Sequence, residues 1–408
     1  MWIKLSSLTL VAIAAVALLS NKIKQLPYGP ATFAVERPSM GGVVDTTIKT
    51  LSTQQNMKII RENFVEGKHP LLIGPETIVF DDDGTMYALT RQGKIVKVHN
   101  FVETSDANHL IADTEQIADF GGSPLGGKFV PGTKIMYFAD DHLGLCRIDV
   151  SKQYPKVEIV ANHVVLKDGS ESKISFADDV DIGPLTGKVY FSDATSVRSE
   201  YDAKKDSYDS LEASKIDLLR GVKSGRLLEY DPETDEVKVL ADGIWFANGV
   251  AVDRKERFIV VTETFMLRAL KYHLEGPKKG ELEVLVDNLT GVPDGADCSK
   301  TADVCYSPLP SSITPLFRLL YSKFMPKTLE AILKTMFLLV PKTLSPKPAK
   351  YACIVEYTSG ADLERGKVLR LFQDPHGEEV NLLTGVTIYG RKLYFSSLHH
   401  NFIGVLDI

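Results

Sequence analysis

The chain has 408 residues, of which 44% are hydrophobic and 25% are charged, and its formal net charge is −6. This composition is typical of a globular protein with a large core, and no run of like charges indicates a disordered tail. The acidic balance argues against a nucleic-acid partner, because contacts with phosphates need a basic surface.

The N-terminal residues 1–24 are predicted to be a signal peptide or a signal-anchor. An apolar run at 8–19 follows Lys4 and precedes Lys22 and Lys24. The run is shorter than the roughly 20 residues of a typical transmembrane helix, and residues 15–17 form a possible cleavage motif. We therefore expect the chain in the secretory pathway, either secreted or held at the endoplasmic reticulum or plasma membrane. The single Asn-x-Ser/Thr sequence, at Asn288, agrees with a lumenal or extracellular location.

A weak repeat follows residues 25–65, which are expected to form a linker and a lead-in strand. Each unit has a turn, an apolar strand, an Asp- or Gly-containing turn and a second apolar strand. The units lie at 74–90, 123–141, 176–194, 246–264, 292–308 and 382–398. Further apolar strands follow most units. About four strands repeated six times are typical of a β-propeller, whereas a β-sandwich would not repeat one motif. We therefore predict an all-β, six-bladed β-propeller at residues 66–408.

Residues 311–347 interrupt the strand pattern after the fifth unit and are predicted to be a helical insertion. Apolar residues recur there at helical spacing: Leu316, Leu319, Leu320, Leu329, Ile332, Leu333 and Phe337. Basic residues are expected on another face: Arg318, Lys323, Lys327 and Lys334. Two interpretations remain open. The insertion is either a basic amphipathic helix on a membrane surface or a cap packed on the propeller with its charges in water.

The four cysteines allow one short bridge. Cys298 and Cys305 are close enough to join two neighbouring strands, and the alternative is that they are buried free thiols. The chain has no C-x-x-C pair, so a zinc site of that type is not indicated.

Polar residues open four of the repeat units, namely Glu76, Asp178, Asn248 and Asp294. The innermost strands of a propeller surround a central channel, so equivalent residues of successive blades converge near its axis. Carboxylate and amide oxygens are ligands that calcium prefers, and carboxylates facing one another need a cation. We therefore predict a calcium site formed by these four side chains. The alternative is that each residue only shapes the turn before its strand.

The order of these motifs resembles the strictosidine synthase-like family, and within it the branch that contains adipocyte plasma membrane-associated protein. The motifs are GPET at 74–77, FADDV at 176–180, FANG at 246–249 and VPDG at 292–295, with related strands at 225–243 and 366–377. The resemblance extends from about residue 70 to 408. It implies a six-bladed propeller behind a signal or anchor, with paraoxonases and gluconolactonases, which are calcium-dependent hydrolases, as wider relatives. Their axial calcium ligands correspond to the same four residues, although the relatives often have Asn where this chain has Asp178.

Two departures from the family pattern bear on activity. Strictosidine synthase uses a glutamate in its last blade, and Thr384, at the matching position here, cannot act as that acid or base. Paraoxonases have a histidine early in blade two, where this chain has Leu125. His142 is a weaker candidate base, and His399 and His400 are expected to be ordinary residues between strands.

Two functions from different classes remain open. The first is a membrane-tethered or secretory-pathway, calcium-dependent hydrolase of aryl esters or lactones. Calcium would stabilise the oxyanion, and Asp179 is the tentative catalytic group that activates water. The second is a non-catalytic, membrane-tethered binding propeller with a structural calcium. The expected partners are a small ester or lactone and the membrane, the latter through the N-terminal segment, with the insertion at 311–347 as a second candidate contact.

Overall fold

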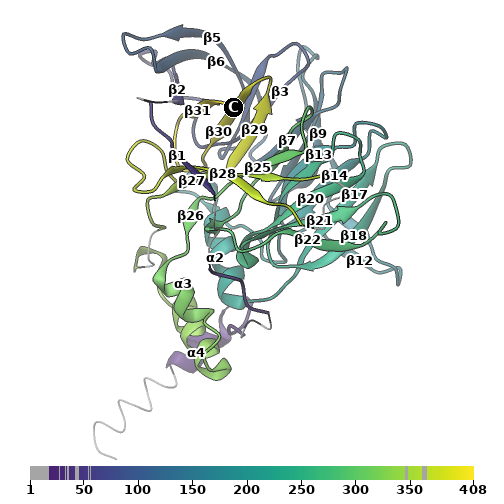
Figure 1. The fold of residues 1–408 in the computed structure, drawn as a ribbon, viewed down its shortest axis with the longest axis vertical. Helices are drawn as coiled ribbons and strands as arrows, with labels where there is room; N and C mark the ends of the chain where they lie inside the picture. Colours follow the sequence, from purple (N-terminus) through teal and green to yellow (C-terminus); the bar gives the residue numbers. More distant parts are fainter. Residues whose placement is uncertain are drawn as a thin grey trace, which may run out of the picture.

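The computed structural model describes residues 18–408 except 27, 33, 35, 42–45, 54, 56, 345–347 and 361–364. It is mostly β-structure, organised as six antiparallel units (Figure 1). Blade one contains β3 (Pro75–Phe80), β4 (Met86–Thr90), β5 (Lys94–Glu103) and β6 (His109–Asp119). Blade two contains β7 (Pro124–Phe129), β8 (Ile135–Asp140), β9 (Gly144–Asp149) and β10 (Glu158–Ala161). Blade three contains β13 (Ala177–Ile182), β14 (Val189–Asp193), β17 (Gly225–Asp231) and β18 (Glu236–Ile244).

The other three units complete a ring. Blade four contains β19 (Ala247–Val252), β20 (Phe258–Glu263), β21 (Arg268–His273) and β22 (Leu282–Val286). Blade five contains β24 (Asp297–Cys298), β25 (Val304–Pro308), β27 (Ala352–Thr358) and β28 (Val368–Asp374). Blade six contains β29 (Gly385–Tyr389), β30 (Lys392–Ser396), β31 (Ile403–Asp407) and β2 (Met57–Glu62). The innermost strands contact one another in the closed order β3, β7, β13, β19, β24, β29 and back to β3. This is the arrangement of the predicted six-bladed propeller.

Two strands that precede blade one in the sequence pair with strands of the ring. β2 pairs with β31 as the outer strand of blade six and also runs parallel to β6 of blade one. β1 (Thr47–Thr50) adds a fifth, parallel strand to blade five. The expected lead-in region thus supplies strands to two blades. The pairing of β2 with β31 joins this region to the last strand of the chain.

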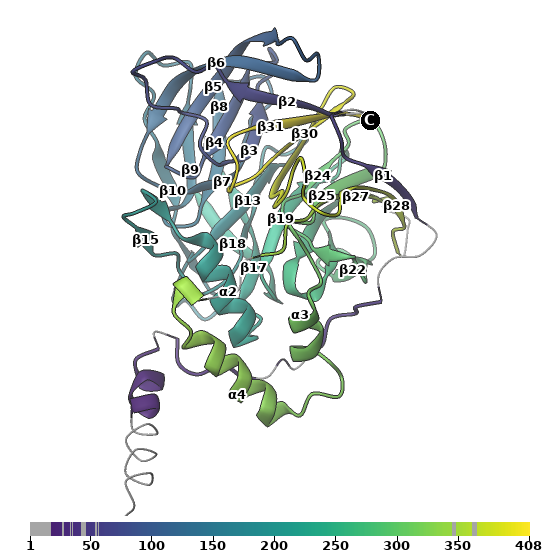
Figure 2. The ribbon, with the colours of Figure 1, turned by 90° about the vertical axis from the view of Figure 1, so that its left-hand side faces the viewer.

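The elements outside the blades gather at one end of the molecule, which we call the helical face. In an antiparallel blade the connection from the second to the third strand lies at the end where the first strand begins. Blade three has β15 (Tyr201–Asp202), β16 (Ser207–Tyr208) and α2 (Ser210–Arg220) in this connection, blade four has η1 (Thr264–Met266), and blade five has β26 (Ser311–Ser312), α3 (Pro315–Leu320), α4 (Lys327–Leu338) and η2 (Lys342–Leu344). Two short pairs precede inner strands: β11 (His163–Val165) with β12 (Glu171–Lys173), and β23 (Gly291–Val292) with β26. Both views show α2, α3 and α4 at the same end (Figures 1 and 2).

The insertion is helical, as predicted, but it forms two helices, and the predicted division into apolar and basic faces holds only in part for α4: Leu333 and Phe337 pack inward, whereas Leu329 and Ile332 do not. Phe317 and Tyr321 pack with Trp245 in the core beneath the helices. Lys334, expected on the basic face, is fully buried beside Glu330, whereas Ile332 is 52% exposed. The reason is that the Glu330–Lys334 ion pair also turns toward the propeller and takes the place of Leu329 and Ile332 there.

Residues 18–24 are helical, and the rest of the predicted signal or anchor lies outside the described residues. Among the described helices, none combines the length and apolar character needed to cross a membrane. Cys298 and Cys305 form a disulfide that joins β24 to β25, and Cys146 and Cys353 are buried free thiols.

Candidate functional site

Three of the four predicted calcium ligands lie at an irregularity near the start of an inner strand, and the fourth, Asp294, lies in the segment before β24. The register of the inner strand shifts between Pro75 and Thr77, between Ala177 and Val180, and between Ala247 and Val250. A β-bulge of this kind interrupts the alternation of side chains and redirects one of them. Glu76, Asp178 and Asn248 occupy these irregular positions. The bulge therefore explains how Asp residues open a strand that otherwise continues with Val and Ile.

Glycines let the inner strands approach one another around the axis. A Cβ on Gly249 would lie 2.3 Å from the backbone nitrogen of Ala296, and one on Gly385 would lie 1.9 Å from the carbonyl oxygen of Glu76. Neither position has room for a side chain. These contacts hold the oxygen-bearing side chains of adjacent blades close together.

All four predicted ligands line one axial cavity of about 140 Å³. Glu76, Asp178 and Asn248 are 4–5% exposed, and Asp294 is partly exposed. The apolar part of the wall includes Leu125, Phe176, Leu211, Phe246, Phe265, Val292, Leu382 and Leu398. Ser210 and Ser214 of α2, together with Pro310, Ser311 and Pro348 at the ends of the insertion, also line the cavity. The axial cavity is therefore bounded by the elements of the helical face.

The cavity wall contains one unusual backbone conformation. Phe246 has φ 62°, in the left-handed region that bulky residues avoid. Its ring lies in the same core as Phe176 and Phe265. This conformation comes two residues before Asn248, and strain of this kind is characteristic of sites where a side chain must point in one direction.

The cavity has more negative charge than the surrounding groups balance. Burial and the carboxylate of Asp294 raise the pKa values of Glu76 and Asp178 well above the usual range. Burial and the nearby Asp179 raise the pKa of Asp294 to about 7, although the Asn248 amide donates a hydrogen bond to it. Asn248 Oδ1 is buried without a hydrogen-bond donor. An oxygen atom in that state, next to mutually repelling carboxylates, is suited to a cation.

The donor chemistry fits a hard cation such as calcium, which prefers oxygen ligands. Within the described ranges of the chain, no three His, Cys, Asp or Glu side chains form a group that could hold a metal by themselves. A site here would therefore depend on Asn248 as well as on the carboxylates. The role of the four residues as calcium ligands stays a prediction.

Asp179, the tentative catalytic residue, does not line the axial cavity. It borders a smaller space of about 20 Å³ deeper in the channel. Its Oδ2 accepts hydrogen bonds from the backbone N–H of Val250, at 2.9 Å, and of Ala296, at 3.5 Å, and its Oδ1 accepts one from Val180 at 2.8 Å. The carboxylate thus ties three inner strands together. Its role in activating water stays a prediction.

A second charged layer, which sequence reasoning missed, lies beside Asp179. Lys128 Nζ is 3.0 Å from Asp297 Oδ1 and 3.7 Å from Asp181 Oδ1. Burial alone would raise the pKa of Asp181, but the ammonium groups of Lys128 and Lys300 hold it below its usual value. We call these three residues (Lys128, Asp181 and Asp297) the lysine layer, and we call Glu76, Asp178, Asn248 and Asp294 the cavity layer.

The structure changes the interpretation of two of the remaining polar residues. His399 was expected to be an ordinary residue between strands, but it lines the axial cavity; the residue is exposed overall, while desolvation of its ring at the cavity wall and the nearby Arg91 lower its pKa. Thr384, which replaces the family glutamate, donates a hydrogen bond to Glu76 Oε2. His142 instead stacks on Tyr208, with ring centroids 4.3 Å apart. No sequence signal identified His399, because it comes from the turn between β30 and β31 and reaches the cavity only in the folded ring.

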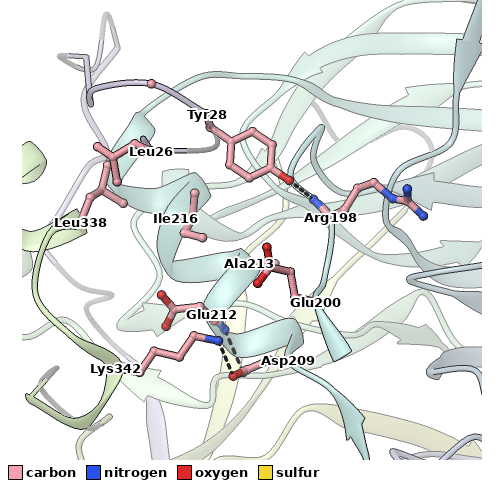
Figure 3. Close-up of a pocket in the computed structure, with 11 residues that line it drawn as sticks. Leu26, Tyr28, Arg198, Glu200, Asp209, Glu212, Ala213, Ile216, Leu338 and Lys342 are labelled. Atoms are coloured by element: carbon pink, nitrogen blue, oxygen red, sulfur yellow. Dashed lines mark hydrogen bonds and ion pairs between the residues drawn. The ribbon is translucent and has the colours of Figure 1, made fainter. Parts of the chain in front are cut away.

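A second cavity, of about 190 Å³, lies between the N-terminal linker, α2 and the end of α4 (Figure 3). Tyr28 accepts a hydrogen bond from the Arg198 backbone N–H at 2.9 Å. Asp209 caps α2 through the N–H of Glu212 and pairs with Lys342 at 3.3 Å. These polar contacts join three segments of the chain, so we assign this cavity a structural role at the junction.

Comparison with known proteins gives matches of both sequence and fold. A family model described as strictosidine synthase matches residues 178–277, and one described as strictosidine synthase-like, N-terminal, matches residues 70–98. The adipocyte plasma membrane-associated protein of Salmo salar is 30% identical over 343 residues, covering 83% of this chain and 76% of that protein.

Two solved structures share the fold at low identity. A gluconolactonase from Xanthomonas campestris has a TM-score of 0.51 at 11% identity, covering 93% of this chain and 97% of its own. A calcium structure of a Trichoderma reesei carbohydrate-active enzyme of family AA12 has a TM-score of 0.50 at 10% identity, covering 92% and 98%. At these identities the likeness shows the propeller fold alone.

Proposed function

Since this chain belongs to the strictosidine synthase-like family, we propose that it is a calcium-dependent hydrolase of aryl esters or lactones, held at a membrane by its N-terminal segment. The observation that supports this most is the axial cavity, where three carboxylates and Asn248 face an apolar chamber. The lactonase with the same fold and the relative named for plasma-membrane association agree with it. Strictosidine synthesis is not proposed, because the hydroxyl of Thr384 is already a donor to Glu76.

Glu76, Asp178, Asn248 and Asp294 would hold the ion. Calcium there would polarise a substrate carbonyl and stabilise the developing oxyanion. Leu125, Phe176 and Phe265 give the cavity an apolar wall that suits an aryl or alkyl group and excludes water.

Two groups of the chain are candidates for taking the proton from the attacking water. His399 lines the cavity and is neutral at pH 7, so its imidazole is available as an acceptor. Asp179 is close to the cavity layer, but its oxygens accept backbone hydrogen bonds. We therefore place His399 before Asp179 as the proton acceptor.

The second candidate function is a non-catalytic binding propeller with a structural calcium. Leu125 favours it, because a side chain without a proton acceptor lines the cavity where paraoxonases have a histidine. In this case the cation would neutralise the cavity layer, and the apolar wall would bind a ligand without turnover.

The test is hydrolysis of a panel of aryl esters and lactones by the full chain, with calcium and with a chelator. We expect turnover that is lost in chelator and in Asp294→Ala. His399→Gln should lower kcat by at least about tenfold, in line with the usual contribution of general base catalysis, while calcium still raises the melting temperature. Glu212→Gln, in the second cavity, is the matched control and should retain activity.

The outcomes separate the two functions. Calcium binding without turnover of any ester or lactone would favour the binding propeller. Unchanged calcium affinity in both Glu76→Gln and Asn248→Ala would contradict the axial site itself. A loss of activity in Asp179→Asn with none in His399→Gln would reverse the order of the two proton acceptors.

A further inference from the structure

The insertion exposes several apolar side chains, although other apolar side chains of the same helices, such as Leu333 and Phe337, pack against the core. Leu329, Ile332 and Met336 lie three and four residues apart on one side of α4 and are 45%, 52% and 56% exposed. Phe324, just before α4, is 94% exposed, and Leu319 of α3 is 54% exposed. We call these five residues the outer stripe. An apolar group of this kind, rimmed by lysines, indicates an interaction surface.

The inner side of α4 explains why the outer stripe does not turn inward. Glu330 accepts a hydrogen bond from the Ala34 N–H at 2.9 Å and pairs with Arg37 at 2.5 Å and Lys334 at 2.8 Å. Lys334 Nζ also lies 4.6 Å from the centre of the Tyr321 ring. A buried ion pair is costly compared with apolar packing, but once formed it fixes one orientation. The polar contacts therefore set the rotation of α4 and leave Leu329, Ile332 and Met336 outside, while Leu333 and Phe337 pack against the core.

The charge around the outer stripe favours an anionic surface. Residues 311–350 contain seven Lys or Arg residues and one acidic residue, Glu330, although the whole chain has a net charge of −6. Glu330 is fully buried in its ion pairs. Lys323 and Lys327 lie at the start of α4, next to Phe324. Lysines beside apolar side chains are the usual composition of a segment that lies in the headgroup region of a bilayer.

The position of residues 18–24 favours a lipid surface as the partner. Residues 18–24 lie at the same end of the molecule as α3 and α4 in both views (Figures 1 and 2). Leu18 and Leu19 are 65% and 47% exposed, and they continue the apolar run that begins at residue 8. A chain held at a membrane by this run would bring the helical face, and not the opposite end of the propeller, to the lipid.

We propose that the outer stripe docks on a lipid bilayer that contains anionic headgroups. Pro310, Ser311 and Pro348, where the insertion leaves and rejoins blade five, line the axial cavity. Docking therefore turns the axial cavity toward the bilayer. It would then receive substrates that partition into lipid; this consequence rests on the proposed hydrolase, and the orientation argument rests on the proposed N-terminal tether.

The test places a single environment-sensitive fluorophore on the full chain reconstituted into vesicles of phosphatidylcholine and phosphatidylserine. Phe324→Cys provides the labelling site, because Cys146 and Cys353 are buried and the other two cysteines are joined. The matched control is Leu185→Cys, which is 75% exposed in the turn between β13 and β14, at the opposite end of the blades. We expect a blue shift and quenching by spin-labelled lipid at position 324, and neither at 185.

Further variants separate docking from tethering by the N-terminus. Ile332→Glu with Met336→Glu, both at exposed positions, should abolish the blue shift at 324 while the protein remains on the vesicles. Without these two substitutions, the label at position 324 should show a smaller blue shift on vesicles of phosphatidylcholine alone. The proposal is overturned if the label at 324 is unaffected by vesicles or responds no more than the label at 185. A shift that appears without vesicles and grows with protein concentration would assign the surface to a second copy of the chain instead.

Discussion

The cavity layer and the lysine layer occupy the same channel, yet they resolve the cost of buried carboxylates in opposite ways. In the lysine layer the chain supplies its own cation, and the pKa of Asp181 is held below its usual value. In the cavity layer no lysine or arginine among the residues that the structure describes lines the wall, and the pKa values of Glu76 and Asp178 are raised. The charges of the lysine layer are therefore balanced by the chain itself, whereas the cavity layer is suited to a cation from solution.

The largest expected effect comes from removing the cation of the lysine layer. Lys128→Met removes the ammonium group that pairs with the buried Asp297 at 3.0 Å and one of the two that lie 3.7 Å from Asp181, so the free energy of unfolding should fall by about 3 kcal/mol at pH 7. Denaturant titration measures this change. Lys300→Met, at a side chain 49% exposed and 3.7 Å from Asp181, is the control and should cost less than about 1 kcal/mol. If Lys128→Met and Lys300→Met lower the free energy of unfolding equally, the lysine layer does not depend on Lys128 in particular, and its contrast with the cavity layer is lost.

The next effect is the pH dependence of the cavity layer without calcium. The pKa of Asp294 is about 7 in the folded chain and 3.8 as its ordinary value, so folding holds a proton that the unfolded chain releases. Stability from this group is therefore fully present below about pH 4 and is lost as the pH rises through about 7. In chelator, the melting temperature should fall between pH 5 and pH 8, and calcium should restore it.

A variant of the same layer sharpens this test. Asp178→Asn removes one of the repelling carboxylates, so the fall in stability between pH 5 and pH 8 should shrink by about 1 kcal/mol, equivalent to somewhat less than one pKa unit. The lysine layer should behave in the opposite sense, because stability from Asp181 is present above its unfolded pKa and is lost in acid. An unchanged slope in Asp178→Asn would show that the carboxylates do not repel one another as the structure indicates.

The smallest expected effect concerns Thr384. Its hydroxyl donates to Glu76 and accepts a hydrogen bond from the Leu398 N–H at 3.2 Å. Thr384→Val removes both contacts and should lower the free energy of unfolding by about 1 kcal/mol. Thr384→Ser keeps the hydroxyl and should restore most of the loss. If valine and serine are equivalent in denaturant titration, the hydroxyl does not support the cavity layer.

The propeller, the helical insertion and the gathering of four polar residues at one cavity were predictable because each depends on local pattern. Strand alternation, turn residues and a motif repeated six times are visible along the chain, and equivalent positions in a ring must converge. The lysine layer was not predictable, because Lys128, Asp181 and Asp297 come from three different blades and none begins a repeat motif. The rotation of α4 was also missed, because aliphatic spacing suggests the buried side of a helix unless distant residues such as Arg37 reverse it.

The sequence by itself therefore determined the fold, the family and which oxygen-bearing side chains meet near the axis. Only the tertiary structure decided which of those charges are balanced, because balance depends on residues such as Lys128 that approach from other blades. It likewise brought His399 to the cavity wall and turned the outer stripe to the surface. The three Asp residues near the start of β13 illustrate both parts. Asp178 lines the cavity, Asp179 accepts a backbone hydrogen bond from the neighbouring inner strand, and Asp181 lies beside a lysine.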